Sequence, residues 1–551
     1  MRRLASRLAL LMLAAAASTP GARGGIMPGF NQSVVASGLD HPTAIGFLPD
    51  GRILVTEQSG ALKLITDGSA TTLIVASNGY CSGREMGLLG IAVDPGFETN
   101  GFVYLYRTNT PYVDCDLFEG RYNEVIRVTM GPDGTVDPQS LTVLLTGIRT
   151  DTGYNTGGAL RIGPDGKLYV GAGDTGIGGT GETPGSNINP YPQDLGDLEG
   201  KILRINLDGT IPADNPFAGQ AGKRGEIWAF GFRNPWRFNF DPLSGRLWVG
   251  EVGDAFMEEL NIVVRGGDYS WPYCEGVFPL GCRKSSDIRP VFSYTHWGDV
   301  SFGDAVVGGD FAGDLFGVFT GSYFFGDFVA DNIYAFRLDK KREVVGGPIM
   351  TFLTHAGAPV DIVFGPDGAL YYAALTGEIR KVTPAVIPSR TLGGTRLALR
   401  ERPAREITVV SRDPVTTERS MTDPMSLGGS VRIVADDGEG GSGIDHVYPL
   451  PAEGWQQINF PFSMEGFAYH DPHGRMGPIR LVRIQNGKVI KLEGRGEGLG
   501  PLVGGSSPGA VNVILTAGTE RYCMSFGGKT QFRPRRSFAG SDAPAPAACH
   551  P

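Results

Sequence analysis

A short hairpin pattern recurs along the sequence between residues 44 and 372 and constrains the fold more than any other feature. Its clearest copy, at residues 160–170, has an alternating apolar segment, the turn Pro164-Asp165-Gly166 and a second alternating segment. Period-two alternation around a tight glycine turn is typical of a β-hairpin. Related copies lie at residues 44–55, 90–106, 237–249 and 361–372, and a degenerate copy at 321–336.

Six such units predict a six-bladed β-propeller. One hairpin cannot bury its apolar face alone, and radial closure buries the faces of all units against one another. A sandwich or solenoid of repeated hairpins is the alternative. The chain has 83 glycines in 551 residues and lacks long amphipathic helical patterns, as expected for an all-β protein. The predicted fold is therefore all-β, a six-bladed β-propeller followed by a smaller C-terminal β-rich domain.

The composition changes along the chain and predicts its division. Residues 1–25 have early arginines, a short apolar stretch and then small residues, which is typical of a secretory signal peptide and too short to span a bilayer. This predicts a periplasmic or secreted protein without a membrane span after cleavage; an uncleaved anchor is the alternative. The predicted parts that follow are the propeller at 26–382, a linker at 383–422, a β-rich domain at 423–532 and a disordered tail at 533–551.

The six cysteines and the net charge agree with export. Disulfides form in exported proteins, and the expected pairs are Cys81 with Cys115 and Cys274 with Cys282, although six cysteines allow 15 pairings. The net charge of −9 argues against a nucleic-acid partner.

Equivalent loop positions of the repeats predict a ligand site. The position nine residues before each turn proline recurs on the loop that leads into each hairpin, and in a propeller these loops surround one mouth of the central channel. A polar ring above an apolar barrel is a common ligand site, although surface loops are also polar because they are solvated. Arg233 stands in an otherwise apolar run and needs a partner. The ring positions and their polar neighbours are Asp40, His41, Glu85, Met86, Asn155, Arg233 and Gly357.

Several motifs carry a family resemblance. Examples are Gly87-Leu88-Leu89-Gly90, Gly200-Lys201-Ile202-Leu203-Arg204, Phe232-Arg233-Asn234-Pro235 and Gly250-Glu251-Val252-Gly253. In these motifs the propeller resembles the glucose/sorbosone dehydrogenase family, which includes soluble pyrroloquinoline-quinone (PQQ) sugar dehydrogenases and hedgehog-interacting-protein-like proteins. The resemblance implies oxidation of an aldose-type sugar at its anomeric carbon, with hydride transfer to a calcium-bound quinone. It does not extend to the C-terminal unit.

The resemblance also implies residue roles. In active members a histidine of a His-Asn-Gly-Gly motif is the general base, and here the motif begins with Asn155. Asparagine does not titrate near neutral pH, so a neighbouring carboxylate, Glu85 or Asp151, is the possible substitute. The predicted catalytic residues are therefore Asn155, Arg233 and Glu85.

Cofactor binding is implied for Arg233, Asn234 and Val252. The backbone carbonyls of Gly253 and Asp254 are implied to hold Ca²⁺, and backbone ligands tolerate side-chain changes.

The basic residues that hold the cofactor carboxylates in the family align with Ala330, Ala358 and Val360, none of which is basic. A tricarboxylate without basic partners binds weakly.

Two hypotheses from different classes follow. The first is an exported PQQ- and calcium-dependent sugar dehydrogenase that uses an external electron acceptor. The second is a non-catalytic exported propeller that binds a carbohydrate or a protein. The fold does not decide between them. Arg233 and the calcium loop favour the enzyme, whereas the missing base favours the binding protein.

Overall fold

The chain divides into two compact units in the computed structural model, at Thr383 and Pro384. Unit 1 comprises Met1–Met27 and Gln32–Thr383, and unit 2 comprises Pro28–Asn31 and Pro384–Pro551. Within these units the structure describes residues 25–27, 29–74, 80–110, 115, 120–177, 188–276, 288–296, 303–339, 341–344, 349–385, 389–413, 424–435, 444–460, 463–518, 520–547 and 549. Except for Gly25, the predicted signal peptide lies outside these residues.

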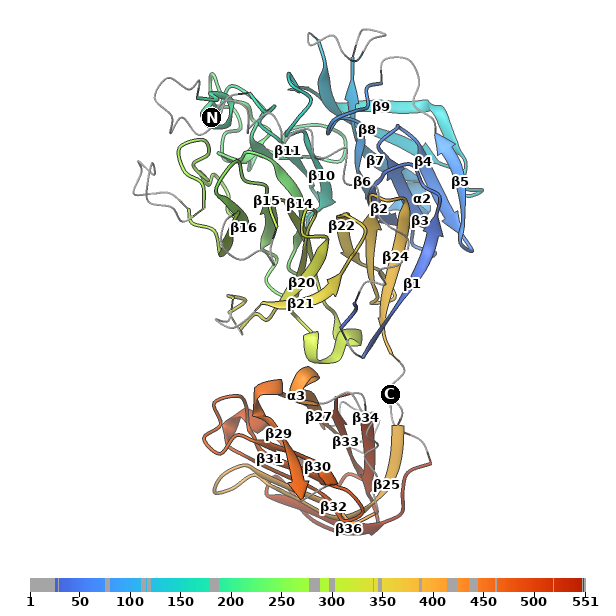
Figure 1. Ribbon diagram of the computed structural model, residues 1–551, viewed down its shortest axis with the longest axis vertical. Coiled ribbons are helices and arrows are strands. Elements are labelled where there is room, and N and C mark those ends of the chain that lie inside the picture. Colours follow the sequence, from blue (N-terminus) through green and yellow to red (C-terminus); the bar gives the residue numbers. More distant parts are fainter. Residues whose placement is uncertain are drawn as a thin grey trace. The chain divides into compact units, whose positions relative to one another are not determined.

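Unit 1 is a ring of six four-stranded antiparallel sheets (Figure 1). The first three sheets contain β2 (Pro42–Phe47), β3 (Ile53–Glu57), β4 (Leu62–Thr66) and β5 (Ser69–Ile74); β6 (Leu88–Val93), β7 (Phe102–Asn109), β8 (Tyr122–Met130) and β9 (Val136–Arg149); and β10 (Gly157–Ile162), β11 (Leu168–Ala172), β12 (Lys201–Ile205) and β13 (Ile227–Phe230). The next three contain β14 (Pro235–Phe240), β15 (Leu247–Glu251), β16 (Met257–Val263) and β17 (Phe292–Thr295); β18 (Val306–Phe311), β19 (Tyr323–Asp327), β20 (Asn332–Phe336) and β21 (Met350–Thr354); and β22 (Pro359–Phe364), β23 (Leu370–Ala374), β24 (Glu378–Pro384) and β1 (Phe30–Ser37). The predicted six-bladed β-propeller is confirmed, and β1 closes the ring by pairing with β24.

The first strands of the blades form the inner ring. β2, β6, β10, β14, β18 and β22 each contact the next, and β22 contacts β2 again. Each has a register shift near its start. The strands approach closely: a Cβ at Gly90 would lie 1.9 Å from the carbonyl oxygen of Gly158. This repeated geometry places the loops before the inner strands in equivalent positions.

The degenerate fifth repeat was assigned one strand out of phase. Residues 321–336 form β19 and β20, the second and third strands of the blade, whereas the inner strand is β18. A short helix, η3 (Asp314–Phe319), connects β18 to β19, where the first, third and sixth blades have the Pro-Asp-Gly turn. The helix removes the Pro-Asp-Gly signal, which explains the error. The remaining short helices of unit 1 are α2 (Phe97–Asn100) and η2 (Tyr191–Gln193).

A buried arginine crosses the inner ring. Arg237 on β14 is 2% exposed and donates from Nε to the carbonyl of Val360 on β22 (3.0 Å). Its Nη2 donates to the carbonyls of Thr43 on β2 (2.6 Å) and Leu89 on β6 (2.9 Å). Nε also lies 3.5 Å from a carboxylate oxygen of the fully buried Asp361, which Arg161 approaches at 3.3 Å. One side chain therefore connects four of the six blades.

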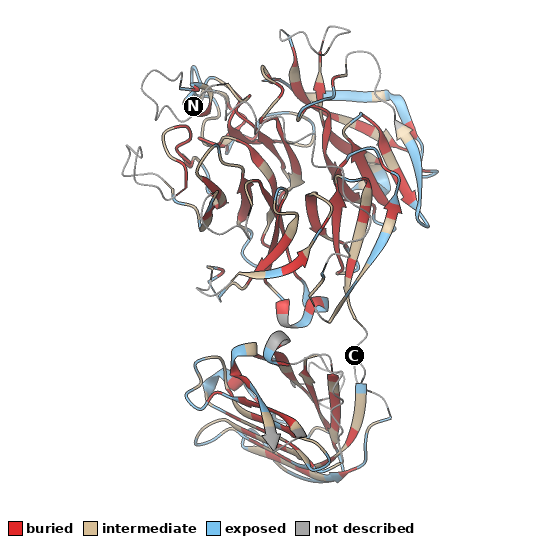
Figure 2. Cartoon of the chain, viewed as in Figure 1, coloured by how far each residue is buried: buried red, intermediate tan, exposed pale blue. Residues whose placement is uncertain are grey.

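Burial follows the inner strands of the propeller (Figure 2). Tyr104, Tyr106, Leu160 and Leu203, for example, pack in one cluster between the second and third blades. The outer strand β9 is largely exposed. The disulfide Cys81–Cys115 forms as predicted, whereas Cys282, the expected partner of Cys274, lies outside the described residues.

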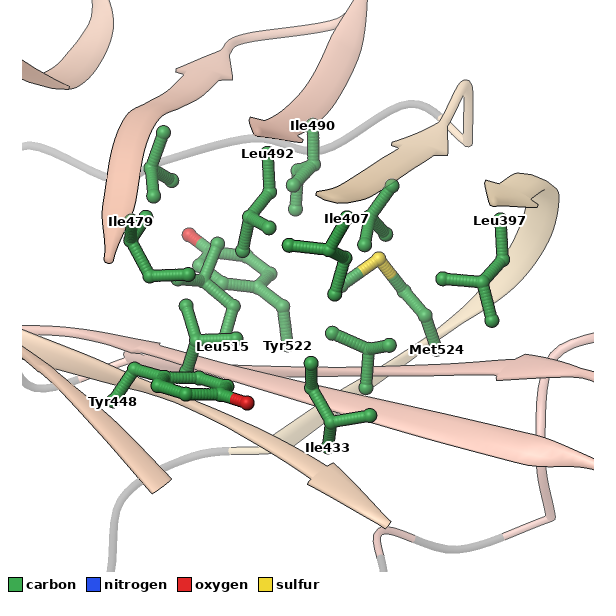
Figure 3. Packing of buried hydrophobic residues seen from close by; sticks show 14 of the residues in the cluster. Leu397, Ile407, Ile433, Tyr448, Ile479, Ile490, Leu492, Leu515, Tyr522 and Met524 are labelled. Atoms are coloured by element: carbon green, nitrogen blue, oxygen red, sulfur yellow. The ribbon is translucent and has the colours of Figure 1, made fainter. Parts of the chain in front are cut away.

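Unit 2 is a curled, twelve-stranded sheet. Ten strands follow the order β28-β27-β33-β34-β25-β26-β32-β31-β30-β29, and β36 pairs with β25 and β35. Buried side chains from many of these strands pack together on its inner face (Figure 3). The strands are β25 (Ser389–Arg400), β26 (Glu406–Ser411), β27 (Gly429–Ala435), β28 (Ile444–Leu450), β29 (Trp455–Phe460), β30 (Ser463–His470), β31 (Ile479–Gln485), β32 (Val489–Arg495), β33 (Val511–Ala517), β34 (Glu520–Phe526), β35 (Lys529–Arg533) and β36 (Ser537–Ala543). The short helices are α3 (Pro424–Leu427), η4 (Ala452–Gly454) and η5 (Glu497–Leu499).

Two sequence-based assignments change in unit 2. The predicted linker at 383–422, in which one or two strands were expected, contains β25 and β26, and both are central strands of the sheet. The predicted disordered tail at 533–551 contains β36, and Cys549 forms a disulfide with Cys523. Within the part of the chain that is described, no helix has the length and apolar character needed to cross a membrane.

Candidate active site

Asn155 lies between two carboxylates at the start of β10. Its backbone has a positive φ of 51°, which asparagine adopts more readily than most residues. The backbone N–H donates to Oε2 of Glu85 (2.7 Å), and Nδ2 donates to Oδ1 of Asp174 (2.8 Å). Asn155 is only 5% exposed. These bonds fix both its backbone and its amide group.

Asp174 holds the Asn155 side chain and was missed by the sequence reasoning. Its Oδ1 also accepts from the backbone of Gly176 (2.9 Å), and its Oδ2 accepts from Nε1 of Trp271 (2.7 Å). Burial raises the pKa of this carboxyl, and Arg233 opposes the rise. In the structure Gly157 pairs with Ala172, so residue 155 faces residue 174. The predicted hairpin did not contain this pair, because a register shift between Gly157 and Leu160 moves the pairing by one residue.

Glu85 comes from the loop before β6, in the neighbouring blade. Its Oε2 accepts from Asn155 and, at 3.5 Å, from Nδ2 of Asn234. Its backbone carbonyl accepts from the hydroxyl of Thr156 (2.7 Å). Burial raises the pKa of the Glu85 carboxyl; Arg233 lowers it and Asp174 adds to the rise. Among the described residues no donor binds Oε1, so one oxygen remains open.

Arg233 has the partners that its apolar surroundings require. Its Nη1 donates to the carbonyl of Val252 (3.2 Å), and its Nη2 pairs with Oδ1 of Asp254 (3.2 Å). The guanidinium carbon lies 5.7 Å from the ring centre of Trp271, within the range of a cation–π contact. The backbone N–H donates to Oε1 of Glu251. The side chain is 17% exposed, so a ligand can still reach it.

Asn234 joins the third and fourth blades. Its Oδ1 accepts from the backbone of Gly157 (3.0 Å), and its own N–H donates to Oε1 of Glu251 (3.1 Å). Its carbonyl accepts from the N–H of Val252 (3.1 Å). The structure therefore gathers the predicted residues Glu85, Asn155, Arg233, Asn234, Val252 and Asp254 into one hydrogen-bonded cluster.

The loop at residues 253–257 has a geometry suited to a calcium ion. Oε1 of Glu275 accepts four successive N–H groups, those of residues 254, 255, 256 and 257, at 2.8, 3.1, 2.9 and 3.0 Å. Because these peptides are trans, the carbonyls of Gly253 and Asp254 point away from Glu275. Neither carbonyl accepts a hydrogen bond from the described residues. Two open carbonyl oxygens are hard ligands of the kind that Ca²⁺ prefers.

Other ring positions are not part of the cluster. Asp40 and His41 form an exposed pair at 2.8 Å, and Met86 is buried. Asp151, the alternative substitute base, is half-buried and makes no hydrogen bond to Asn155 or Arg233; its backbone carbonyl accepts from Arg121 (2.6 Å).

The three positions aligned with the basic residues of the family use their backbone groups for structural hydrogen bonds. The N–H of Ala330 donates to Asp327 (2.8 Å), and that of Ala358 donates to Asp331 (2.6 Å). The carbonyl of Val360 binds Arg237 in the inner ring. The cluster thus fits a calcium ion and the quinone end of a cofactor next to Arg233, whereas these three positions do not fit its carboxylates.

Comparisons with known proteins agree on one family. The family model "Glucose / Sorbosone dehydrogenase" matches residues 39–380. The aldose sugar dehydrogenase YliI of Escherichia coli is 30% identical over 370 residues, 64% of this chain and 93% of that protein. Quinoprotein glucose dehydrogenase B of Acinetobacter calcoaceticus is 32% identical over 45% of this chain and 53% of its own length.

More distant relatives and solved structures extend this picture. The mouse hedgehog-interacting protein is 26% identical over 38% of this chain and 31% of its own length. The solved structure of the soluble aldose sugar dehydrogenase of Escherichia coli in its apo form has a TM-score of 0.55 at 26% identity. That match covers 65% of this chain and all of the other.

Proposed function

Because this chain belongs to the glucose/sorbosone dehydrogenase family, we propose that it is an exported, PQQ-dependent dehydrogenase that oxidises an aldose-type sugar at its anomeric carbon. One observation carries the proposal: Arg233 is held by Val252 and Asp254 beside the open carbonyls of the 253–254 loop. The guanidinium is thus fixed in position, and the side chain is 17% exposed, so that a ligand bound at this loop could contact it.

Different residues of the chain would bind the cofactor, bind the calcium ion and position Asn155. Arg233 and Asn234 would hold the quinone, and the carbonyls of Gly253 and Asp254 would hold Ca²⁺. When bound, PQQ would accept a hydride from the sugar. Asp174 fixes the side chain of Asn155, and Glu85 fixes its backbone, so the wall beside the sugar is rigid. An external electron acceptor would reoxidise the cofactor in the periplasm or outside the cell.

A second function is favoured by different observations. Asn155 stands where the family has its base, and Ala330, Ala358 and Val360 stand where the family has the cations that hold the cofactor. These features favour a non-catalytic exported propeller that binds a carbohydrate or a protein, and the similarity to the hedgehog-interacting protein agrees with it.

Calorimetry with PQQ separates the two functions. Purified mature protein is titrated with PQQ in excess Ca²⁺ and again with a chelator. The dehydrogenase predicts saturable, calcium-dependent binding that Arg233→Gln weakens at least tenfold. Arg52→Gln is the matched control, since Arg52 pairs with Asp50 in the turn between β2 and β3. Absence of saturable heat in Ca²⁺ would exclude the cofactor and leave the binding protein.

A further inference from the structure

The site has several carboxylates, but they differ in what their oxygens already bind. Both oxygens of Asp174 accept hydrogen bonds, and the residue is 2% exposed. Glu251 is 6% exposed; its Oε1 accepts two backbone N–H groups, and its Oε2 has no partner among the described residues but is buried from solvent. Asp254 pairs with the guanidinium of Arg233. Glu85 is half-buried and has an open Oε1.

The position of Glu85 is fixed next to the backbone of Asn155. Its Oε2 lies 2.7 Å from the Asn155 nitrogen, and its own carbonyl is bound by Thr156. The carboxylate therefore lies within one hydrogen bond of the residue that replaces the base. A proton acceptor needs an oxygen that is fixed in position and free to bind a substrate hydroxyl. The Glu85 carboxylate is fixed by its bond to Asn155, and no donor among the described residues binds its Oε1.

The charges around Glu85 agree with this use. Arg233 lowers its pKa, whereas burial and Asp174 raise it, and the net direction is upward. A carboxylate with a raised pKa is a stronger base than an exposed glutamate.

We propose that Glu85 is the catalytic base of this protein, acting from the neighbouring blade in place of the missing histidine. The inference rests on the proposed dehydrogenase function. Oε1 accepts the proton of the anomeric hydroxyl as that O–H bond breaks. The C1–H bond breaks with its electron pair, which passes as a hydride to the quinone, and the C1=O double bond of the lactone forms. The sugar is oxidised by two electrons, and the quinone is reduced by the same two.

The test compares Glu85→Gln with Asp151→Asn in protein loaded with PQQ and Ca²⁺. Glutamine keeps the oxygen that accepts from Asn155 but cannot take a proton. We expect kcat/KM for dye-linked aldose oxidation to fall at least about 100-fold in Glu85→Gln, and less than about threefold in Asp151→Asn. The acid limb of the kcat/KM–pH profile should disappear, while the Kd for PQQ stays within about twofold. Adding Asn155→His to Glu85→Gln should restore activity.

The outcomes separate the two levels of the proposal. An active wild type whose Glu85→Gln variant retains kcat/KM and its acid limb overturns the assignment of Glu85 alone. A wild type that neither binds PQQ nor oxidises aldoses overturns the dehydrogenase function and the base with it. A Glu85→Gln variant that loses PQQ affinity in parallel with activity shows a structural role and also rejects the base.

Discussion

Replacing Arg237 by methionine should destabilise the propeller more than any surface arginine would. The guanidinium donates three hydrogen bonds to carbonyls on β2, β6 and β22 and faces the buried Asp361. Burial lowers its pKa to about 10, so it stays charged at neutral pH. Methionine fills part of the space but donates nothing. Asp361 would keep Arg161, at 3.3 Å, as its remaining cation.

The size of the effect follows from these contacts. Breaking a buried ion pair from one side costs about 3–5 kcal/mol, because the other charge remains buried. A cost of about 4 kcal/mol is reasonable, since Arg161 compensates part of the charge. Unfolding entropy is about 2.1 cal/mol/K per residue, or about 0.74 kcal/mol/K for the 352 residues of Gln32–Thr383. The propeller Tm should therefore fall by about 5 °C.

Differential scanning calorimetry of the whole chain measures this shift. The transition of unit 2 serves as an internal reference, and Arg52→Met, at an exposed pair, should shift the propeller Tm by less than about 1 °C. Combining Arg237→Met with Asp361→Asn removes the uncompensated charge and should recover part of the loss. A propeller Tm within 1 °C of wild type for Arg237→Met alone would refute the reasoning.

Three further predictions concern the site and the pH dependence of stability. Asn155→His should raise dye-linked aldose oxidation at least about tenfold in protein loaded with PQQ and Ca²⁺, because Asp174 would orient the imidazole as it now orients the amide; unchanged turnover would argue against Asp174 as the orienting group. Glu275→Gln should weaken Ca²⁺ binding measured by calorimetry, since one charged oxygen now holds four backbone N–H groups of the loop; an unchanged Kd would separate the loop from the metal. The pKa of Asp310 is raised from 3.8 to about 6 by burial, so the folded state holds its proton more tightly than the unfolded state. Protonated Asp310 contributes about 3 kcal/mol to the free energy of unfolding below pH 4, and this contribution is lost as the pH rises to about 6. Asp310→Asn should remove this pH dependence from the free energy measured by urea unfolding; identical pH slopes for the two proteins would contradict the assignment.

The propeller could be predicted because its blades repeat one local signal. Each tight turn fixes a hairpin, and equal spacing forces radial closure, so Asn155 and Arg233 could be placed on one rim. The fifth blade was out of phase because η3 replaces its turn. Asp174 could not be found from the predicted hairpin, because a register shift between Gly157 and Leu160 moves the pairing by one residue. Glu275 could not be found either, because its contacts join the loop at 253–257 to a segment that no repeat aligns.

The C-terminal strands were harder to predict for a different reason. β25 contains arginines and a Gly-Gly pair, and β36 is mostly small or polar. Their alternation is weak, and they become strands because they pair with each other in the sheet. Local sequence contains little information on such non-local pairing.

The pairing of β1 with β24 delays closure of the ring during synthesis of the chain. Residues 38–377, 340 in number, separate the two strands, and a ribosome needs roughly 20–70 s to make them at about 5–20 residues per second. Throughout that interval β1 has no partner within its own blade. No nascent fragment that ends before Glu378 is a smaller version of the finished ring, since every such fragment lacks the pair that joins the last blade to the start of the chain. The ring therefore closes only near the end of propeller synthesis. A chaperone that protects unpaired strands would have to cover β1 for longer than any other strand of the propeller.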